Sequence, residues 1–332
     1  MQKTPYYKGG LKAIVTVGNI LRNLSEQKKF LSAQIAPILQ QAETNNDGSL
    51  NKEDFKKINR YYGLAVPAIL GEAFCILHGR KMTNRERWAA TAQGAMTGLF
   101  DDFFDKDFLT DEAVKSLMNN PDADNNKRSN ENLFNRFYSI ALKHADEPLL
   151  IRNSLEKVFD AQVKSKSQTN GKLSTGSLQS ITFEKGGLSL LFYRSAFKPL
   201  LSSTEETLFY ELGAAMQLCN DIFDVYKDRE AGIQTMITDT RHISPVRDLL
   251  HQKIAYCRED QFSKEYSPIH FQRFFDYLSV SIFNRAMICL DLLEANEQST
   301  GNQFNVHAYS RAQLICDMDT MKNKLRSAFR SF

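Results

Sequence analysis

Apolar residues recur at helical spacing along almost the whole chain, and strand-like alternation bounded by hairpin turns is scarce. With 42% apolar and 24% charged residues, the 332-residue chain has the composition of a globular protein. The pattern predicts an all-α fold. The expected helical segments are 13–42, 52–78, 85–105, 132–144, 148–164, 181–201, 204–230, 245–258, 268–294 and 307–331.

Two acidic clusters, at residues 101–105 and 220–228, lie inside these apolar segments. Carboxylates are rarely buried without a partner, so such clusters suggest cations held between facing helices. The polar stretches 121–130 and 165–180 both fall between the clusters. A site shared by the clusters requires one continuous fold, so we predict a single domain over residues 1–332.

Each cluster places oxygen-bearing side chains on one helix face, because positions four residues apart lie within about 40° of each other. The first face carries Asp101 and Asp105, with Asp102 on its flank, and the second carries Asn220, Asp224 and Asp228. Like charges at this spacing destabilise an isolated helix, and a divalent cation would offset the repulsion. Oxygen ligands without nearby His or Cys favour Mg²⁺ over zinc.

Glycines lie one or two turns before each cluster: Gly94 and Gly98 before the first, Gly213 before the second. Glycine inside a helix costs about 1 kcal/mol relative to alanine, so these positions call for an explanation. Two remain open: room for an apolar ligand beneath a metal-binding rim, or close packing between helices.

The second cluster has clear helix boundaries. Ser203 and Glu206 fit a capping box, and Gly232 can close the other end. The helix between them would have about 28 residues and a length of roughly 42 Å.

These residues resemble motifs of the class I terpenoid synthase (isoprenoid synthase) superfamily, most closely those of a bacterial-type terpene cyclase. Asp101-Asp102-Phe103-Phe104-Asp105 matches the aspartate-rich DDxxD motif. Asn220, Asp224, Lys227 and Asp228 resemble NDxxSxxKE, with Asp in place of both Ser and Glu. The segment 211–219 is similar to a helix of trans-polyprenyl diphosphate synthases, and Glu184-Lys185-Gly186-Gly187-Leu188 to their helix-breaking Lys-Thr-Gly element.

The resemblance implies an antiparallel helical bundle around a deep central pocket, with three Mg²⁺ ions (or Mn²⁺) holding a prenyl diphosphate at its mouth. The metal ligands it implies are Asp101, Asp105, Asn220, Asp224 and Asp228. The catalytic residues it implies are Lys227, Lys185, Asp102, which would bond a diphosphate-sensing arginine, and Arg194. The expected substrate contacts are Lys185, Lys227, Arg229, Arg311, Phe100 and Gln217. A surface role for each arginine and a core role for Phe100 are the alternatives.

The function we expect is a Mg²⁺-dependent terpene synthase that ionises a linear prenyl diphosphate, such as farnesyl or geranylgeranyl diphosphate, and cyclises the carbocation with release of diphosphate. One alternative is a trans-prenyltransferase that couples or elongates prenyl diphosphates, like polyprenyl or squalene/phytoene synthases. Another is a non-catalytic helical protein that binds a prenyl diphosphate. Lys8-Gly9-Gly10 is similar to an element for a second diphosphate, but it lies far from the first cluster, which favours a single substrate.

Two further segments have open alternatives. Residues 43–54 are close to a calcium-binding EF-hand loop, with Gly48 at the sixth position, although a helix-connecting turn is the simpler explanation. The basic C-terminal segment either covers the diphosphate or forms a solvated helix end; its charges are Lys322, Lys324, Arg326 and Arg330.

Composition narrows the partners. A net charge of +3 is too small to indicate nucleic-acid binding. We see no long uncharged apolar run and no signal peptide, so we expect no membrane span and a cytoplasmic location. The five scattered cysteines predict buried thiols in a reducing compartment. The expected partner is the prenyl diphosphate, and a homodimer remains open.

Overall fold

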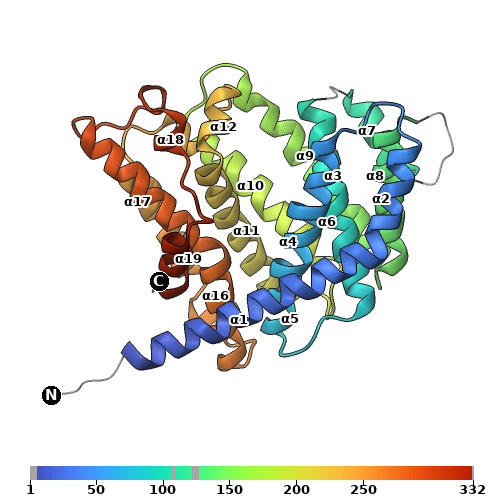
Figure 1. Ribbon diagram of the computed structural model, residues 1–332, viewed down its shortest axis with the longest axis horizontal. Helices are drawn as coiled ribbons and strands as arrows, with labels where there is room; N and C mark the ends of the chain where they lie inside the picture. Colours follow the sequence, from blue (N-terminus) through green and yellow to red (C-terminus); the bar gives the residue numbers. More distant parts are fainter. Residues whose placement is uncertain (1–5, 107–108, 122–126, 331–332) are drawn as a thin grey trace. The chain divides into compact units, whose positions relative to one another are not determined.

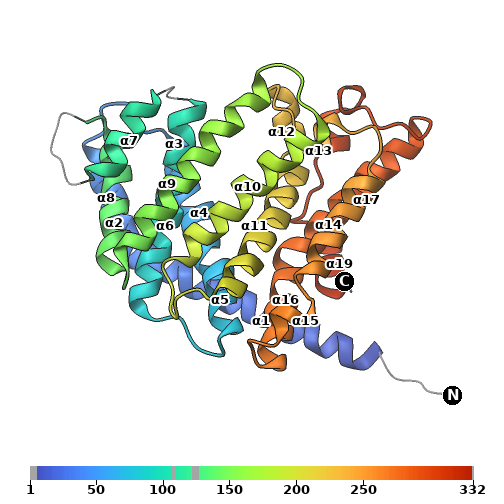
Figure 2. The same cartoon turned by 180° about the vertical axis from the view of Figure 1, so that it is seen from behind.

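The computed structural model describes residues 6–106, 109–121 and 127–330, and every regular element in this part is a helix. The predicted all-α fold is therefore confirmed. The chain divides into two units. Figures 1 and 2 show its helices coloured by their position in the sequence. Unit 1 holds residues up to Gly18, Val163–Leu191 and all residues from Leu201, and unit 2 holds Asn19–Gln162 and Phe192–Leu200. Whether they form a single domain around a central pocket stays a prediction.

Unit 2 contains the first half of the chain. Its α-helices are α1 (Tyr6–Phe30, shared with unit 1), α2 (Ala36–Thr44), α3 (Lys52–Lys56), α4 (Tyr62–Ala65), α5 (Glu72–Leu77), α6 (Asn84–Asp105), α7 (Asp111–Asn119), α8 (Ser129–His144) and α9 (Pro148–Ser165, also shared). Turns of π-helix connect several of them: Leu31–Ile35, Lys57–Tyr61 and Val66–Gly71.

The central pair of unit 2 is α6 and α8, which lie side by side in both views (Figures 1 and 2). Helix α6 begins where Thr83 and Glu86 form a reciprocal capping box. Its apolar face meets α8 through aromatic rings, with Phe100 stacked on Phe134 at 5.9 Å between centroids. Phe100 is 2% exposed, so it is a core side chain of unit 2.

Unit 1 contains the later helices. They are α10 (Thr175–Arg194, whose last residues belong to unit 2), α11 (Ser203–Phe223), α12 (Val225–Glu230), α13 (Met236–Asp239), α14 (Ser244–Tyr256), α15 (Asp260–Ser263), α16 (Pro268–Leu278), α17 (Asn284–Ser299), α18 (Arg311–Leu314) and α19 (Met321–Phe329). Short 3₁₀ turns occur at Lys166–Thr169 and Val306–Ala308, and a π-helical turn at Ser279–Phe283.

The glycines beside the acidic clusters allow helices to approach closely. A Cβ on Gly94 would lie 2.5 Å from the carbonyl oxygen of Tyr62, on α4. In unit 1 a Cβ on Gly186 would lie 2.2 Å from the carbonyl oxygen of Gly213, and one on Gly213 would lie 2.3 Å from that of Gly186. Neighbouring backbone therefore fills the space next to these glycines. The packing explanation holds, and the ligand-space explanation is wrong at these positions.

The predicted helix over 204–230 is divided at Asp224, where ψ is 8° and the regular α-helix ends. Its N-cap is Ser202, one residue before the predicted Ser203, and the Ser202 hydroxyl accepts from the Glu205 N–H. The predicted stop at Gly232 is confirmed. Gly232 has a φ of +67°, and the next N–H, on Ile233, donates to the Asp228 carbonyl.

Other boundaries also differ from prediction. Helix α10 continues through Gly186 and Gly187, so this pair does not break the helix here. The predicted continuous helix over 307–331 is wrong. Three short helices occupy this region, and their N-caps are Asn305, Ser310 and Thr320. The short helices α7, α13 and α15 were not predicted at all.

The loop between α2 and α3 is a turn built on side-chain acceptors. Asn46 Oδ1 accepts from the N–H groups of Gly48 and Leu50 at 3.0 and 3.1 Å. Asn51 and Asp54 form a reciprocal capping box at the start of α3. The prediction of a helix-connecting turn is therefore confirmed.

The helical run Lys52–Leu77 is long and apolar enough to cross a membrane by length and composition alone. Half of its most apolar window is buried inside unit 2, and core helices of soluble proteins meet the same criterion. This run falls within the predicted helical segment 52–78, in which no long uncharged apolar run was seen. The expected absence of a membrane span stays a prediction.

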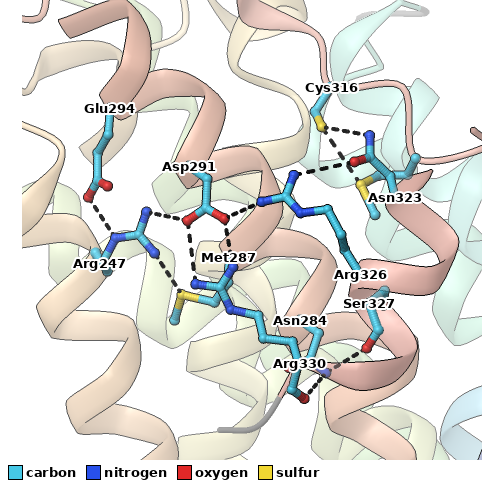
Figure 3. A network of polar contacts seen from close by, with 11 residues as sticks. Arg247, Asn284, Met287, Asp291, Glu294, Cys316, Asn323, Arg326, Ser327 and Arg330 are labelled. Carbon is cyan, nitrogen blue, oxygen red and sulfur yellow. Dashed lines mark hydrogen bonds and ion pairs between the residues drawn. The ribbon is translucent and has the colours of Figure 1, made fainter. Parts of the chain in front are cut away.

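A partly exposed charge network holds the C-terminal helix in unit 1 (Figure 3). Asp291 on α17 accepts from Arg247 of α14 at 2.9 Å, from Arg326 of α19 at 2.7 Å and from Arg330 at 2.7 Å. Burial opposes ionisation of Asp291, but Arg330 and Arg247 hold its pKa below the usual value. Arg326 and Arg330 are thus engaged within unit 1, while Lys322 and Lys324 are exposed.

Candidate functional site

The second acidic segment runs along the end of α11 and through α12. The N–H of Asp224 donates to Asn220 and that of Asp228 donates to Asp224, at 2.9 and 2.8 Å, so the four-residue spacing persists through the bend. The three side chains differ in exposure. Asn220 is exposed, the Asp224 side chain is 36% exposed and Asp228 is buried.

Asp221 is a buried carboxylate at the centre of the hydrogen bonds of this segment. It was not among the site residues predicted from the sequence. Gln217 Nε2 donates to its Oδ1 at 2.9 Å, and Thr182 Oγ1, from α10, donates to its Oδ2 at 3.1 Å. Burial raises the pKa of Asp221 to about 6, against the lowering effect of these hydrogen bonds and of Lys185. The adjacent Asn-Asp pair was the available signal, since two consecutive helix residues point about 100° apart and Asp221 follows the apolar positions of the helix.

Asp228 lies close to Asp221 and Asp224. Burial and then repulsion from these two carboxylates raise the pKa of Asp228 to about 7, while Lys227 and Lys185 lower it. Lys227 Nζ lies 3.6 Å from Asp224 Oδ2, but its side chain is 75% exposed, so this ion pair contributes little. The described residues form no ion pair with either Asp221 or Asp228, so these two buried carboxylates have no bonded cation within unit 1.

Two predicted arginines lie beside this face. Arg229 Nη1 donates to the carbonyls of Val306 and Tyr309 at 3.1 and 2.6 Å, which ties α12 to the segment before α18. The guanidinium groups of Arg229 and Arg311 lie 4.8 and 5.7 Å from the Tyr226 ring centroid. Arg229 is therefore engaged with backbone, whereas Arg311 is exposed beside α12 and remains a candidate anion contact.

The first acidic segment, in unit 2, is organised differently. Lys57 Nζ donates to both oxygens of Asp102 at 2.6 and 2.7 Å, and Lys106 Nζ lies 3.1 Å from Oδ2. Burial opposes ionisation of Asp102, but these lysines lower its pKa. Asp54 lies against the same carboxylate, and burial together with Asp102 raises its pKa. Asp102 therefore has lysine partners in place of the predicted arginine.

The other two acids of this segment lie at the end of α6. Tyr62 Oη donates to Asp101 Oδ2 at 3.4 Å, and Asp101 is half-buried. Asp105 is exposed on the last turn. These two carboxylates share one helix face, as the sequence predicted.

Arg194 is buried within unit 2. It is 1% exposed, and its guanidinium donates to the carbonyls of Phe197 and Pro199 at 2.7 Å each. These bonds close the turn after α10 within unit 2. The surface role weighed for Arg194 is wrong, because the side chain is buried, and its predicted catalytic role stays a prediction.

Among the described residues, no three His, Cys, Asp or Glu side chains are close enough together to hold a metal ion. The donor chemistry in unit 1 nevertheless fits a hard divalent cation. Its donors are the oxygens of Asn220, Asp224 and Asp228, and burial raises the pKa values of Asp228 and of the neighbouring Asp221. A bound cation would oppose this effect of burial and reduce the repulsion among the carboxylates.

Comparisons with known proteins give a limited result. No protein-family model and no curated protein matches the chain. Among solved structures, the chain is similar to a crystal structure of a dehydrosqualene synthase in complex with ligand. The likeness has a TM-score of 0.49 and 11% sequence identity, and it covers 94% of this chain and 96% of that chain. At this level it identifies neither the activity nor the ligand of the present protein.

Proposed function

We propose that this protein is an enzyme that acts on a prenyl diphosphate bound, with divalent cations, at the acidic face of α11 and α12. The observation that carries the proposal is the pair of buried carboxylates, Asp221 and Asp228, whose pKa values are raised to about 6 and about 7. Burying two acids near a third, Asp224, is unfavourable unless a cation joins them. A bound cation and its anionic diphosphate ligand would together balance the charge of this acidic face.

Different residues of unit 1 would bind the cation and the diphosphate. Asn220, Asp224 and Asp228 are the proposed cation ligands, and Gln217 and Thr182 orient Asp221 behind them. Lys185, Lys227 and Arg311 are the proposed contacts to diphosphate oxygens. Bound Mg²⁺ would supply electrostatic stabilisation of the departing diphosphate. In unit 2, Asp101 and Asp105 remain proposed cation ligands.

The proposed activity is the step that cyclisation and coupling of prenyl units have in common. The sequence motif favours a cyclase, but Asp224 stands where a cyclase usually carries Ser or Thr. The name of the similar solved structure fits the coupling alternative at least as well. The two reactions share the ionisation step and differ in whether a second prenyl diphosphate is needed.

The decisive experiment measures diphosphate release from farnesyl and geranylgeranyl diphosphate, with Mg²⁺ and with excess EDTA. We expect Mg²⁺-dependent release by the wild-type chain and loss of release in Asn220→Ala. Glu206→Ala is the matched control, since Glu206 is an exposed acid on the first turn of the same helix. Equal turnover in the Asn220 and Glu206 variants would contradict the proposal.

Product analysis then separates the finer alternatives. A hydrocarbon or alcohol from a single substrate indicates cyclisation. A product with two prenyl units indicates coupling, and a longer diphosphate formed when isopentenyl diphosphate is added indicates elongation. Saturable Mg²⁺-dependent binding without any diphosphate release would instead show a non-catalytic binding protein and overturn the enzymatic proposal.

A further inference from the structure

A cavity of about 180 Å³ in unit 1 contains two of the five cysteines. Ile222 and Phe223 of α11 form part of its wall, and Cys289 of α17 faces Cys316 and Met318 from the segment between α18 and α19. A water molecule takes up about 30 Å³ of liquid volume, so the cavity admits several waters or a small polar reagent. Both thiols therefore line a space that a small molecule can enter.

Cys289 and Cys316 lie close enough for each thiol to shift the pKa of the other. Cys316 Sγ also lies 3.8 Å from Met318 Sδ, and Asn323 Nδ2 donates to it at 3.6 Å, as Figure 3 shows for Asn323. Cys289 is 5% exposed, whereas Cys316 is half-buried. The geometry thus gives one half-buried sulfur with a donor aimed at it and a second, buried cysteine on the wall of the same cavity.

The charges around Cys316 favour its thiolate. The hydrogen bond from Cys289 and the nearby Arg326 lower the pKa of Cys316 to about 7, although burial, Asp317 and Asp291 oppose them. Hydrogen bonding to Cys316 and burial raise the pKa of Cys289, with Arg285 opposing. A thiolate, not a thiol, is the nucleophile in oxidation and exchange reactions.

The other cysteines show the opposite environment. Burial raises the pKa of Cys75 to about 12, and it also raises the pKa values of Cys219 and Cys257. These buried thiols are therefore internal controls for any reagent that selects a reactive cysteine.

We propose that Cys316 is a peroxide-reactive thiol whose oxidised form is resolved by Cys289, giving an intramolecular disulfide between α17 and the segment that joins α18 to α19. The Cys316 thiolate attacks one oxygen of hydrogen peroxide, the O–O bond breaks, and the departing hydroxide takes up a proton as water. Cys289 sulfur then attacks the Cys316 sulfenic acid. The S–O bond breaks, and hydroxide leaves as water with the Cys289 proton. Two thiols lose two electrons and one peroxide becomes two waters.

This modification site does not depend on the proposed function. It requires only that the accessible sulfur react first and that its buried neighbour follow. The product would fix the segment around Cys316 to α17 by a covalent bond, and a thiol reductant would reverse it.

The test treats the reduced full-length chain with a small excess of hydrogen peroxide, blocks remaining thiols under denaturing conditions and maps peptides without reduction. We expect a Cys289–Cys316 cross-linked peptide that dithiothreitol removes, while Cys75, Cys219 and Cys257 stay alkylated. Cys316 should be lost at least about tenfold faster than these three.

Variants assign the order of the steps. In Cys289→Ser, dimedone should trap a sulfenic acid on Cys316, and in Cys316→Ser neither adduct nor cross-link should form. Cys257→Ser is the matched control, since it removes a buried thiol of the same unit and should leave the cross-link unchanged. Equal reaction of all five cysteines, a dimedone adduct on Cys289, or a cross-link between two chains would each overturn the proposal. The wild-type mapping decides the matter even if a variant fails to fold.

Discussion

The two acidic segments look alike in the sequence, but the structure treats them in opposite ways. In unit 2 the central acid, Asp102, is bonded by Lys57 and lies near Lys106, and its pKa is lowered. In unit 1 the central acids, Asp221 and Asp228, have raised pKa values and form no ion pair within the described residues. A carboxylate that already has its cation stabilises the fold, whereas one that lacks it is prepared for a ligand that brings one.

The strongest test of this contrast is Asp224→Ala. It removes a proposed cation ligand from the segment that lacks positive charge, so we expect diphosphate release to fall by about 1,000-fold, equivalent to about 4 kcal/mol in the activation barrier. Steady-state kinetics at saturating Mg²⁺ measure the effect. The rate of diphosphate release by Glu206→Ala should stay within about twofold of the wild-type rate. A loss in Glu206→Ala as large as that in Asp224→Ala would contradict the contrast between the two segments.

The second test measures protein stability in place of enzymatic activity. Asp102→Ala leaves Lys57 and Lys106 without their carboxylate, so we expect the free energy of unfolding to fall by about 3 kcal/mol. Urea denaturation measures it. Asp105→Ala, an exposed acid on the same turn, should change stability by no more than about 0.5 kcal/mol. If both substitutions have the same small effect, the lysine-bonded acid is not a structural element.

The third test uses pH, because the two segments should respond with opposite sign. Asp228 has a folded pKa of about 7 against 3.8 when unperturbed, so its contribution to stability is present below about pH 4 and is lost as the pH rises to 7. Asp102, with a lowered pKa, contributes above pH 3.8 and loses this as the pH falls.

Without divalent cations, the free energy of unfolding of the wild-type chain should therefore fall further between pH 4 and pH 8 than that of Asp228→Asn. We expect the two changes to differ by about 2 kcal/mol. This is less than the full pKa shift implies, because Asp221 titrates beside it. Denaturation curves across this range give the answer. A parallel pH profile for the two proteins would show that Asp228 is not strained in the folded state.

The smallest effect concerns Thr182→Val, which removes the hydroxyl bonded to Asp221 at almost constant volume. We expect a loss of about 1 kcal/mol in unfolding free energy, larger at pH 8 than at pH 5, since a hydrogen bond to a charged acceptor is the stronger one. Thr207→Val is the control, because the Thr207 hydroxyl is exposed and bonds only within its own helix. Equal effects at both pH values would mean that Asp221 stays protonated throughout.

Helical periodicity was enough to predict the fold class and most long helices, because an apolar stripe has the same spacing wherever the helix packs. Interruptions were harder to predict. The bend at Asp224 lies within an unbroken apolar pattern, and the C-terminal segment is divided by single capping residues such as Ser310. These depend on local hydrogen bonds, which leave the periodicity unchanged.

The candidate site shows the same limit. The spacing of Asn220, Asp224 and Asp228 was correct along the backbone, but their exposure could not be derived from spacing alone. Asp102 was expected to bond a diphosphate-sensing arginine and Arg194 to act in catalysis, whereas Lys57 bonds Asp102 and Arg194 donates to two backbone carbonyls. Such partners come from distant parts of the chain, and motif matching takes no account of them.

The carboxylate of Asp291 has a consequence for how unit 1 opens. Guanidinium groups from α14 and from the C-terminal end of the chain bond the same two oxygens on α17. A fluctuation that frees one arginine also weakens the fixation of the others, because the shared acceptor loses its position. Amide hydrogen exchange in α14 and α19 should then proceed as one cooperative unit. Substitutions at Arg247 and Arg330 should likewise be non-additive in a double-mutant cycle.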